Sequence, residues 1–419
     1  MKRKLRKHVK AICALLAAAA VLGGGFMGVD KFNPEKRSLT IVEGPDSVTT
    51  AVEAQGDGET LDPGVSAKAA ILIDSSSGKV IYEKESHKHL PPASVTKVMT
   101  LLLIMEGCDT GKISMDDEVV ISENAAGMGG SQMYMEPGEK HTVEELVKGI
   151  IMVSANDACV AMAEHLCGST DSFVREMNDK AMDMGLEDSH FVNTNGLPVT
   201  KHYSCAYDIG MISKELMEHE ELKEWFTAWQ DSIKVGLPGK EKDFTLTNTN
   251  KLIKNYSGAM GIKTGFTEDA GYCLAGAAER DGTRLIGVVL GCETSDIRFD
   301  EMSRMLDFGF ANYETADIAE KGDTLYEASI PKADKTKVRA VAEDDIRLLV
   351  KKDSGEKIKK EVVMDKNIDL PIKKGDRLGT VIIYEDERKT AEYKIVSDRN
   401  VEKAGFGDIY IRMMKKLTN

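Results

Sequence analysis

Residues 91–97 read PPASVTK and are followed by VMTLLLIM at residues 98–105. The second stretch is apolar on nearly every face and contains no turn residue, which predicts a helix that is buried all round. Two prolines can introduce a helix but cannot continue its interior, so we expect the helix to begin close to Ser94. The spacing of three residues then places the side chains of Ser94 and Lys97 on one face, one turn apart. A serine at a helix start with an amine beside it is a candidate activated nucleophile.

Two further motifs follow this pair. Ser154-x-Asn156 lies 60 residues after Ser94, at an interruption between two helical segments, where a side chain can project into a cleft. A KTG triplet at residues 263–265 begins 109 residues after Ser154. Each triplet is common by itself, but the three motifs in this order and context form a specific set.

Two other triplets imitate these motifs. Residues 76–79, SSGK, have the Ser-x-x-Lys spacing, but they lie in a Ser/Gly turn that we interpret as the tip of a hairpin. Residues 122–124, SEN, have the Ser-x-Asn spacing, but they come only 28 residues after Ser94. We expect neither of them to belong to the site.

Composition and the N-terminal segment predict an exported protein. The chain has 419 residues, of which 42% are hydrophobic, enough for two or three domains, and its net charge of −14 argues against a general nucleic-acid binder. Residues 1–10 are basic and residues 11–29 are apolar, the pattern of an export signal. Small residues at 17–20 offer cleavage points, whereas the apolar span is also long enough to stay as a membrane anchor, and both alternatives remain open. We expect the protein at the outer face of the cell membrane or in the cell wall.

The cysteines and histidines predict neither a metal nor a cofactor. Six cysteines follow the apolar N-terminal span, and export permits disulfides, but Cys159, Cys273 and Cys292 lie in apolar or Gly/Ala-rich runs. Free, buried thiols are therefore expected. The chain has no CxxC pair and no HExxH motif, which disfavours a thiolate metal site and a zinc peptidase. His87 and His89 are expected to be exposed to solvent beside the hairpin.

The order of the remaining elements predicts a sheet built from both ends of one domain. Before it, residues 30–65 are polar and acidic and are expected to form a flexible linker. Strands are predicted at 67–73, 80–82, 260–265, 272–278 and 284–290. Helices are predicted at 142–152, which starts with a capping box, and at 158–166, 172–184, 207–219 and 298–313. Strands at both ends with helices between them favour an α/β (α+β) fold in which an antiparallel sheet is covered by helices. We also expect a loop at 119–135 to lie near the cleft.

A small all-β module is predicted after the last helix. Its strand candidates are 338–341, 346–351, 360–364, 378–384 and 391–396, separated by short polar turns. The last segment, residues 405–419, places apolar residues at helical spacing among Arg and Lys. It fits an in-plane membrane helix and equally a terminal helix packed on its own domain.

On its three motifs the chain resembles the low-molecular-mass penicillin-binding proteins that act as D-alanyl-D-alanine carboxypeptidases, serine peptidase family S11. Further blocks carry the resemblance and look closest to the sporulation-associated branch: GGSQM at 129–133, EPGE at 136–139, SANDA at 154–158, NGL at 195–197, HYS at 202–204, Asp208 and KTGFT at 263–267. The resemblance implies the penicillin-recognising serine transferase fold. The boundaries that follow are an N-terminal signal or anchor at 1–29, a linker at 30–65, the D,D-peptidase domain at 66–318, an all-β domain at 319–400 and an amphipathic helix at 401–419.

The resemblance also implies acyl transfer through a serine ester. Ser94 would attack the carbonyl between the last two D-alanines of a peptidoglycan stem peptide, D-alanine would leave, and water would release the shortened peptide. Lys97 must be neutral to accept the serine proton, and burial together with the ammonium of Lys263 would lower its pKa. Ser154 would relay a proton to the leaving amine, and Asn156 would position the substrate amide and Lys97.

The remaining implied roles concern binding. Lys263 and Thr264 would hold the terminal carboxylate of the substrate, and the backbone N–H groups of Ser94 and Phe266 would form the oxyanion hole. Arg298 is a candidate for a second carboxylate contact, although an arginine at a helix start is more often a surface or capping charge. β-Lactam antibiotics are expected as covalent inhibitors, and the membrane surface as a partner.

Other functions share parts of this pattern. A serine β-lactamase has all three motifs, but class A enzymes place a deacylating glutamate in a Glu-x-x-x-Asn pattern, and none occurs between Ser154 and Lys263. A transpeptidase or an endopeptidase would use the same site. A non-catalytic cell-wall scaffold would use the β module and would have no need of Ser94 and Lys97.

Overall fold

The structure is a computed structural model that describes residues 40–44, 47–52, 62–330, 333–352, 358–385, 387–407, 409–410 and 414. The predicted export signal at 1–29 lies outside these residues. Among the helices of the described residues, none combines the length and the hydropathy that a membrane span requires.

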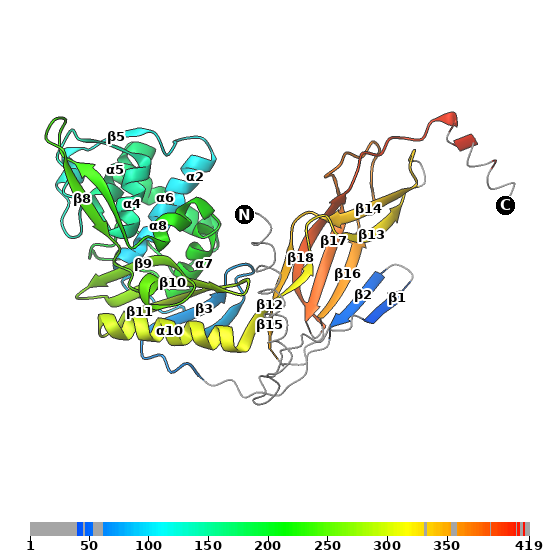
Figure 1. Cartoon of the computed structure of the whole chain (residues 1–419), viewed down its shortest axis with the longest axis horizontal. Helices are drawn as coiled ribbons and strands as arrows, with labels where there is room; N and C mark the ends of the chain where they lie inside the picture. The colour runs from blue at the N-terminus through cyan, green and yellow to red at the C-terminus, as the bar shows by residue number, and fades with distance from the viewer. Residues whose placement is uncertain are drawn as a thin grey trace, which may run out of the picture. The chain divides into compact units, whose positions relative to one another are not determined.

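A five-stranded antiparallel sheet organises the first part of the described chain, in the order β4-β3-β11-β10-β9 (Figure 1). Its strands are β3 (Ala69–Asp74), β4 (Val80–Lys84), β9 (Ala259–Thr267), β10 (Gly271–Arg280) and β11 (Thr283–Cys292). Strand β3 pairs with β11 in a register that places Leu285 opposite Asp74. The prediction of a sheet built from both ends of the domain is therefore confirmed, as is the tight turn at 281–282, where both residues have positive φ.

Helices cover both faces of this sheet, because β3 is apolar on both sides. Ala69, Ile71 and Ile73 belong to one core, shared with α2, α4, α5 and α7. Ala70 and Leu72 belong to a second core, shared with α10, which runs along the opposite face (Figure 1). The helices are α2 (Lys97–Asp109), α3 (Glu123–Ala126), α4 (Val143–Met152), α5 (Asn156–Cys167), α6 (Thr170–Asp183), α7 (Ala206–Leu216), α8 (Lys223–Thr227), α9 (Leu252–Asn255) and α10 (Ser295–Asn312).

The central helix is the one that the PPASVTK stretch introduces. A 3-10 turn, η1 (Ala93–Thr96), leads directly into α2, so the helical structure begins close to Ser94 as expected. Residues 97–105 of α2 are all buried, which confirms the helix buried on every side. A second short turn, η2 (Glu220–Leu222), precedes α8.

Two small hairpins complete this part of the chain. Strand β5 (Glu118–Val120) pairs with β6 (Lys140–Thr142), and β7 (Gln230–Val235) pairs with β8 (Lys242–Thr247). The capping box that we predicted at the start of α4 is present between Thr142 and Glu145. The six cysteines of the described residues are free; four are buried, while Cys108 and Cys167 are partly exposed.

The C-terminal part is all β, as predicted. A seven-stranded sheet has the order β1-β2-β16-β17-β18-β14-β13, and a separate pair joins β12 to β15. The strands are β12 (Tyr313–Ala319), β13 (Thr324–Ser329), β14 (Lys337–Ala342), β15 (Ile346–Lys351), β16 (Ile358–Met364), β17 (Arg377–Glu385) and β18 (Arg388–Ser397). All five strand candidates in this region are confirmed.

Two elements of the structure cross the expected boundaries. Strand β12, which we placed in the preceding domain, pairs with β15 of the β module, so the β structure begins at Tyr313 directly after α10. Within the expected linker, β1 (Thr40–Gly44) and β2 (Ser47–Val52) form a hairpin, and β2 pairs with β16. The sequences of these two strands are rich in β-branched residues and are separated by Pro45 and Asp46, residue types typical of turns. The acidic composition of residues 30–65 concealed this local signal.

Candidate active site

The start of α2 brings Ser94 and Lys97 together. Lys97 is fully buried, and its Nζ lies 2.9 Å from Ser94 Oγ, 2.7 Å from Asn156 Oδ1 and 2.7 Å from the carbonyl oxygen of Asn195. Ser94 is partly exposed, whereas the residues on both sides of it are buried. The hydroxyl therefore faces solvent on one side and a buried amine on the other.

The Ser-x-Asn motif lies at the break between α4 and α5. Ser154 occupies the left-handed region, with φ of +62°, and Asn156 is the first residue of α5. Asn156 accepts from Lys97 through Oδ1 and donates through Nδ2 to the carbonyl oxygen of Gly129, at 2.7 Å. Ser154 Oγ is buried and has no hydrogen-bond partner among the described residues. Buried hydroxyls are almost always paired, so this group is poised for a partner that comes from a ligand.

The KTG triplet lies on β9, at the edge of the sheet beside η1. A Cβ atom on Gly265 would lie 3.0 Å from the carbonyl oxygen of Pro92 and 3.1 Å from the backbone nitrogen of Ser94. A side chain at this position would push the two backbones apart by a few tenths of an ångström, so glycine suits this close approach. Phe266 follows directly, so its N–H belongs to the backbone that adjoins Ser94. The Phe266 ring is exposed and packs on Tyr272, with 4.3 Å between ring centroids.

The two lysines of the site are both buried. Burial lowers the pKa of Lys97 to about 8, although Cys159 and Asp157 act in the opposite direction. Burial also lowers the pKa of Lys263 well below its usual value, and the charge of Lys97 lowers it further. The expected direction for Lys97 is confirmed, and its main cause is burial; the repulsion between the two amines lowers the pKa of Lys263.

Thr264 and Arg298 complete the set of residues that the sequence singled out. The hydroxyl of Thr264 lies 2.7 Å from that of Thr249. Arg298 is neither a surface nor a capping charge: it is buried, and its Nη1 donates to the carbonyl oxygens of Gly265 and Cys273, at 3.0 and 3.2 Å. Burial lowers the pKa of Arg298. Its guanidinium therefore links β9, which carries the KTG triplet, to β10 through their backbone carbonyl oxygens.

The sequence analysis quoted the blocks NGL at 195–197 and SANDA at 154–158 but assigned Asn195 and Asp157 no role in the site. Asn195 contributes only its backbone oxygen, which no side-chain pattern reveals. The only sequence signal for this contact is the adjoining Gly196. In the structure a Cβ atom on Gly196 would lie 1.8 Å from the carbonyl oxygen of Ala93, so the chain passes very close to the start of the Ser94 turn. Asp157 accepts from the N–H of Met133, at 3.0 Å, and so holds the loop at 119–135 against the start of α5. This loop lies at the site, as expected.

The two imitating triplets have structural roles. Ser122 caps α3, because its side chain accepts from the N–H of Ala125. Residues 76–79 form the turn between β3 and β4, where Asp74 accepts hydrogen bonds from Ser76 and Ser77. Two groups of possible metal ligands occur among the described residues, His87 with Asp188 and Cys205, and Asp109 with His219 and Glu221. Neither group includes a residue of the Ser94 site.

An antiparallel sheet between two helical layers, a Ser–Lys pair at the start of the central helix and a Lys-Thr-Gly edge strand together define the class of penicillin-recognising serine enzymes. Comparison with known proteins agrees. The family described as D-alanyl-D-alanine carboxypeptidase matches residues 57–294, and the C-terminal domain of penicillin-binding protein 5 matches residues 313–403.

Individual relatives cover most of the chain. The D-alanyl-D-alanine carboxypeptidase DacF of Bacillus subtilis is 43% identical over 341 residues, which span 81% of this chain and 87% of DacF. DacC of Escherichia coli is 32% identical over 84% of this chain and 89% of its own length. The crystal structure of penicillin-binding protein 5 from Haemophilus influenzae aligns with a TM-score of 0.68 and 30% identity, covering 82% of this chain and all of that one. The chain belongs to the D-alanyl-D-alanine carboxypeptidase family and is a serine-type hydrolase of that family.

Proposed function

We propose that this protein removes the terminal D-alanine from peptidoglycan stem peptides ending in D-Ala-D-Ala, through an acyl-enzyme on Ser94. One observation carries the assignment of the nucleophile. The buried amine of Lys97 lies 2.9 Å from Ser94 Oγ, while Ser94 itself is open to solvent. Burial lowers the pKa of this amine towards neutral pH. A hydroxyl beside such a base is an activated nucleophile.

The contacts of Lys97 support its role as the base. A neutral amine has two hydrogens and one lone pair. The carbonyl oxygens of Asn156 and Asn195, both at 2.7 Å, can accept the two hydrogens. The lone pair is then left for the proton of Ser94, so the neutral form of Lys97 satisfies all three contacts at once. Lys97 takes the Ser94 proton as Oγ bonds to the carbonyl carbon of the substrate.

Ser154 completes the proton path. The tetrahedral intermediate carries its negative oxygen toward the N–H groups of Ser94 and Phe266, and collapses when the nitrogen of the departing D-alanine is protonated. Ser154 Oγ passes that proton on from Lys97, which explains why this buried hydroxyl has no hydrogen-bond partner in the described part of the free protein. Water then attacks the ester, Lys97 accepts a proton again, and the shortened peptide leaves with Ser94 restored.

Lys263 and Thr264 hold the terminal carboxylate of the substrate. Burial lowers the pKa of Lys263 in the free protein, and repulsion from the ammonium of Lys97 lowers it further. An arriving carboxylate stabilises the charged form of Lys263. Substrate binding therefore leaves Lys263 charged and Lys97 as the neutral partner. Arg298 acts as a positioning residue, because it holds the carbonyl of Gly265 rather than the substrate.

The same site reacts with β-lactam antibiotics as covalent inhibitors. Their acyl-enzyme is long-lived, because the chain has no Glu-x-x-x-Asn pattern between Ser154 and Lys263 to drive rapid deacylation. This property separates the proposed carboxypeptidase from a β-lactamase.

The experiment combines two measurements. Intact-protein mass spectrometry after incubation with benzylpenicillin should show one stable adduct, and a diacetyl-Lys-D-Ala-D-Ala peptide should release D-alanine. Ser94→Ala should abolish both, whereas Ser76→Ala, in the other Ser-x-x-Lys triplet, should change neither. Rapid drug turnover without an adduct would instead indicate a β-lactamase, and retained D-alanine release in Ser94→Ala would refute the serine mechanism.

We further propose that the protein works at the outer face of the cell membrane. The support is the basic and apolar N-terminal segment, together with the exposed side chains of Phe406, Ile409, Tyr410 and Met414 near the C-terminus. Flotation with anionic vesicles, after removal of residues 1–29, tests the C-terminal contribution. Phe406→Ser with Tyr410→Ser should reduce flotation, and unchanged flotation would contradict the proposal.

A further inference from the structure

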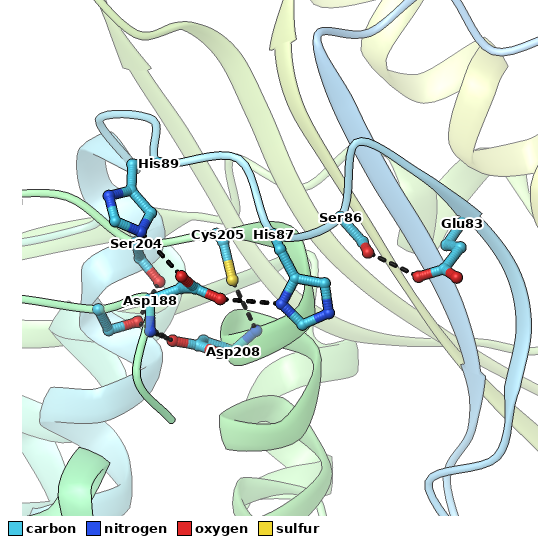
Figure 2. Close-up of polar contacts among 9 residues, drawn as sticks. Glu83, Ser86, His87, His89, Asp188, Ser204, Cys205 and Asp208 are labelled. Atoms are coloured by element: carbon cyan, nitrogen blue, oxygen red, sulfur yellow. Dashed lines mark hydrogen bonds and ion pairs between the residues drawn. The ribbon is translucent and has the colours of Figure 1, made fainter. Parts of the chain in front are cut away.

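A cluster of metal-binding side chains lies outside the Ser94 site. His87 and His89 both point at the carboxylate of Asp188 (Figure 2). His87 Nδ1 lies 2.8 Å from Asp188 Oδ2, and His89 Nε2 lies 2.8 Å from Asp188 Oδ1. The thiol of Cys205 completes the group: its sulfur and the ligand atoms of His87 and Asp188 lie within 4.8 Å of one another.

The backbone holds these residues in place although they come from three separate segments. Leu90 and Ser204 exchange two backbone hydrogen bonds, of 2.8 and 3.0 Å, directly beside His89 and Cys205. His190 and Tyr203 form a second such bridge, two residues after Asp188. These bridges join the histidine segment, the Asp188 segment and the start of α7 before any ligand is present.

The side chains are oriented as well. The His87 ring stacks on Tyr207 with 4.7 Å between centroids, and the His89 ring stacks on Tyr203 with 4.5 Å. The thiol of Cys205 accepts from the N–H of Asp208, at 3.3 Å, as the N-cap of α7. The histidine rings are half-exposed while Cys205 is buried, so an ion would enter from solvent and meet the thiol last.

We propose that this cluster binds one divalent transition-metal ion, with Zn²⁺ as the best fit. His87 Nδ1, Asp188 and the Cys205 thiolate are the three protein ligands, and water completes the tetrahedral site. His89 Nε2 stays on the other carboxylate oxygen of Asp188 and orients that ligand. Imidazole, carboxylate and thiolate are the ligand types of zinc, whereas Mg²⁺ and Ca²⁺ prefer oxygen alone. Binding breaks the hydrogen bond between His87 and Asp188 and releases the thiol proton to solvent, and no redox change is involved.

The other candidate group lacks these properties. His219 Nδ1 lies 3.7 Å from both Asp109 and Glu221, both carboxylates are largely exposed, and no thiol takes part. It therefore serves as an internal comparison for the proposed site.

An ion at this place would have a structural role. Residues 87–89 lie just before the PPASVTK stretch in the sequence. A metal ion would therefore link the segment that precedes Ser94 to the start of α7. No proposed step of acyl transfer uses His87, His89, Asp188 or Cys205. The proposal therefore stands or falls separately from the proposed function.

The test uses the full chain without a polyhistidine tag, freed of metal with a chelator and titrated with Co²⁺. We expect one equivalent to bind, with a thiolate-to-metal charge-transfer band and the strong visible bands of tetrahedral cobalt. Cys205→Ser should abolish the charge-transfer band, and Asp188→Asn should weaken binding ~10-fold or more. Cys205→Ser keeps the helix cap, because serine is itself a preferred N-cap residue.

Zinc provides a second readout. Saturating Zn²⁺ should raise the melting temperature of the unaltered protein by about 5 °C, and that of Cys205→Ser much less. Cys167→Ser and His219→Gln are matched controls that should bind cobalt as the unaltered chain does. An absence of binding at micromolar metal would overturn the proposal, as would binding that persists unchanged in Cys205→Ser and Asp188→Asn.

Discussion

Lys97 Nζ lies 2.9 Å from Ser94 Oγ, and the same amine contacts two carbonyl oxygens at 2.7 Å. In this arrangement the protonation state of Lys97 decides whether Ser94 can lose its proton. A charged amine would donate to all three oxygens, whereas the neutral amine has a lone pair to offer. The reactivity of Ser94 should therefore follow the titration of Lys97.

Acylation should become faster with increasing pH. Because burial lowers the pKa of Lys97 to about 8, the neutral form is scarce at pH 6 and dominant above pH 9. The second-order rate constant for benzylpenicillin should rise about tenfold per pH unit below the pKa of Lys97, and level off above it. Lys97→Arg, which stays charged, should be nearly inactive throughout. Rates that do not change between pH 6 and 9 would contradict the assignment of Lys97 as the base.

Ser154→Ala should impair turnover without destabilising the protein. The hydroxyl has no hydrogen-bond partner among the residues that the structure describes, so its removal breaks no hydrogen bond between them. Loss of a proton relay should lower kcat for D-alanine release by about 10²-fold or more. Steady-state kinetics and a melting curve test both parts. A clear drop in melting temperature would mean that Ser154 has a structural partner in solution.

Arg298→Met should distinguish positioning from direct substrate contact. If Arg298 only holds the Gly265 carbonyl, the substitution should slow acylation by peptide and penicillin alike, by about tenfold. The preference for a free terminal carboxylate over the corresponding peptide amide should stay as it was. If that preference collapses instead, Arg298 contacts the carboxylate, as the resemblance first implied.

Glu139→Gln should destabilise the fold most clearly near neutral pH. Burial acts to raise the pKa of Glu139, but hydrogen bonds from the N–H groups of Glu136 and Gly236 and from His141 outweigh it, so the net pKa is lowered. A carboxyl with a lowered folded-state pKa stabilises the fold above its unfolded pKa, and this contribution disappears as the pH falls through the folded pKa. We expect a loss of about 2 kcal/mol at pH 7.

The pH dependence of that loss is the control. The difference in unfolding free energy between Glu139→Gln and the unaltered protein should shrink as the pH drops below about 4.5. Urea titrations at pH 7, 5 and 4 measure it. A difference that stays constant over this pH range would mean that the charge of Glu139 does not contribute to the free energy of unfolding.

Local patterns predicted most of the fold, because each was decided by neighbouring residues. The all-round apolar run after Lys97, the capping box at Thr142 and the turn at Asp281 depend only on short stretches, and the structure contains all three. The hairpin at 40–52 was missed because its strand pattern is brief and lies in an acidic segment. Strand β12 was missed because it follows α10 without a turn.

The site also combines features that local sequence predicts with features that depend on distant contacts. Its side chains were found because three motifs list them in order, whereas Asn195 acts through a carbonyl oxygen that every residue possesses. The partners of Arg298 and the grouping of His87 with Asp188 and Cys205 depend on which distant segments meet. The sequence alone does not show which distant segments come into contact. That becomes known only with the register of the sheet and the backbone bridges between the loops.

The strand order also has a consequence in time. Ser94, Lys97, Ser154 and Asn156 are synthesised long before β9, β10 and β11, and β3 has no partner but β4 until β11 exists. A nascent chain that ends near residue 250 therefore contains the nucleophile but neither the Lys263 strand nor a complete sheet. Because β3 and β11 lie far apart in the sequence, we expect their pairing to form late in folding. The site around Ser94 in a chain of this design is therefore complete only after the last strand of the sheet, β11, has been made.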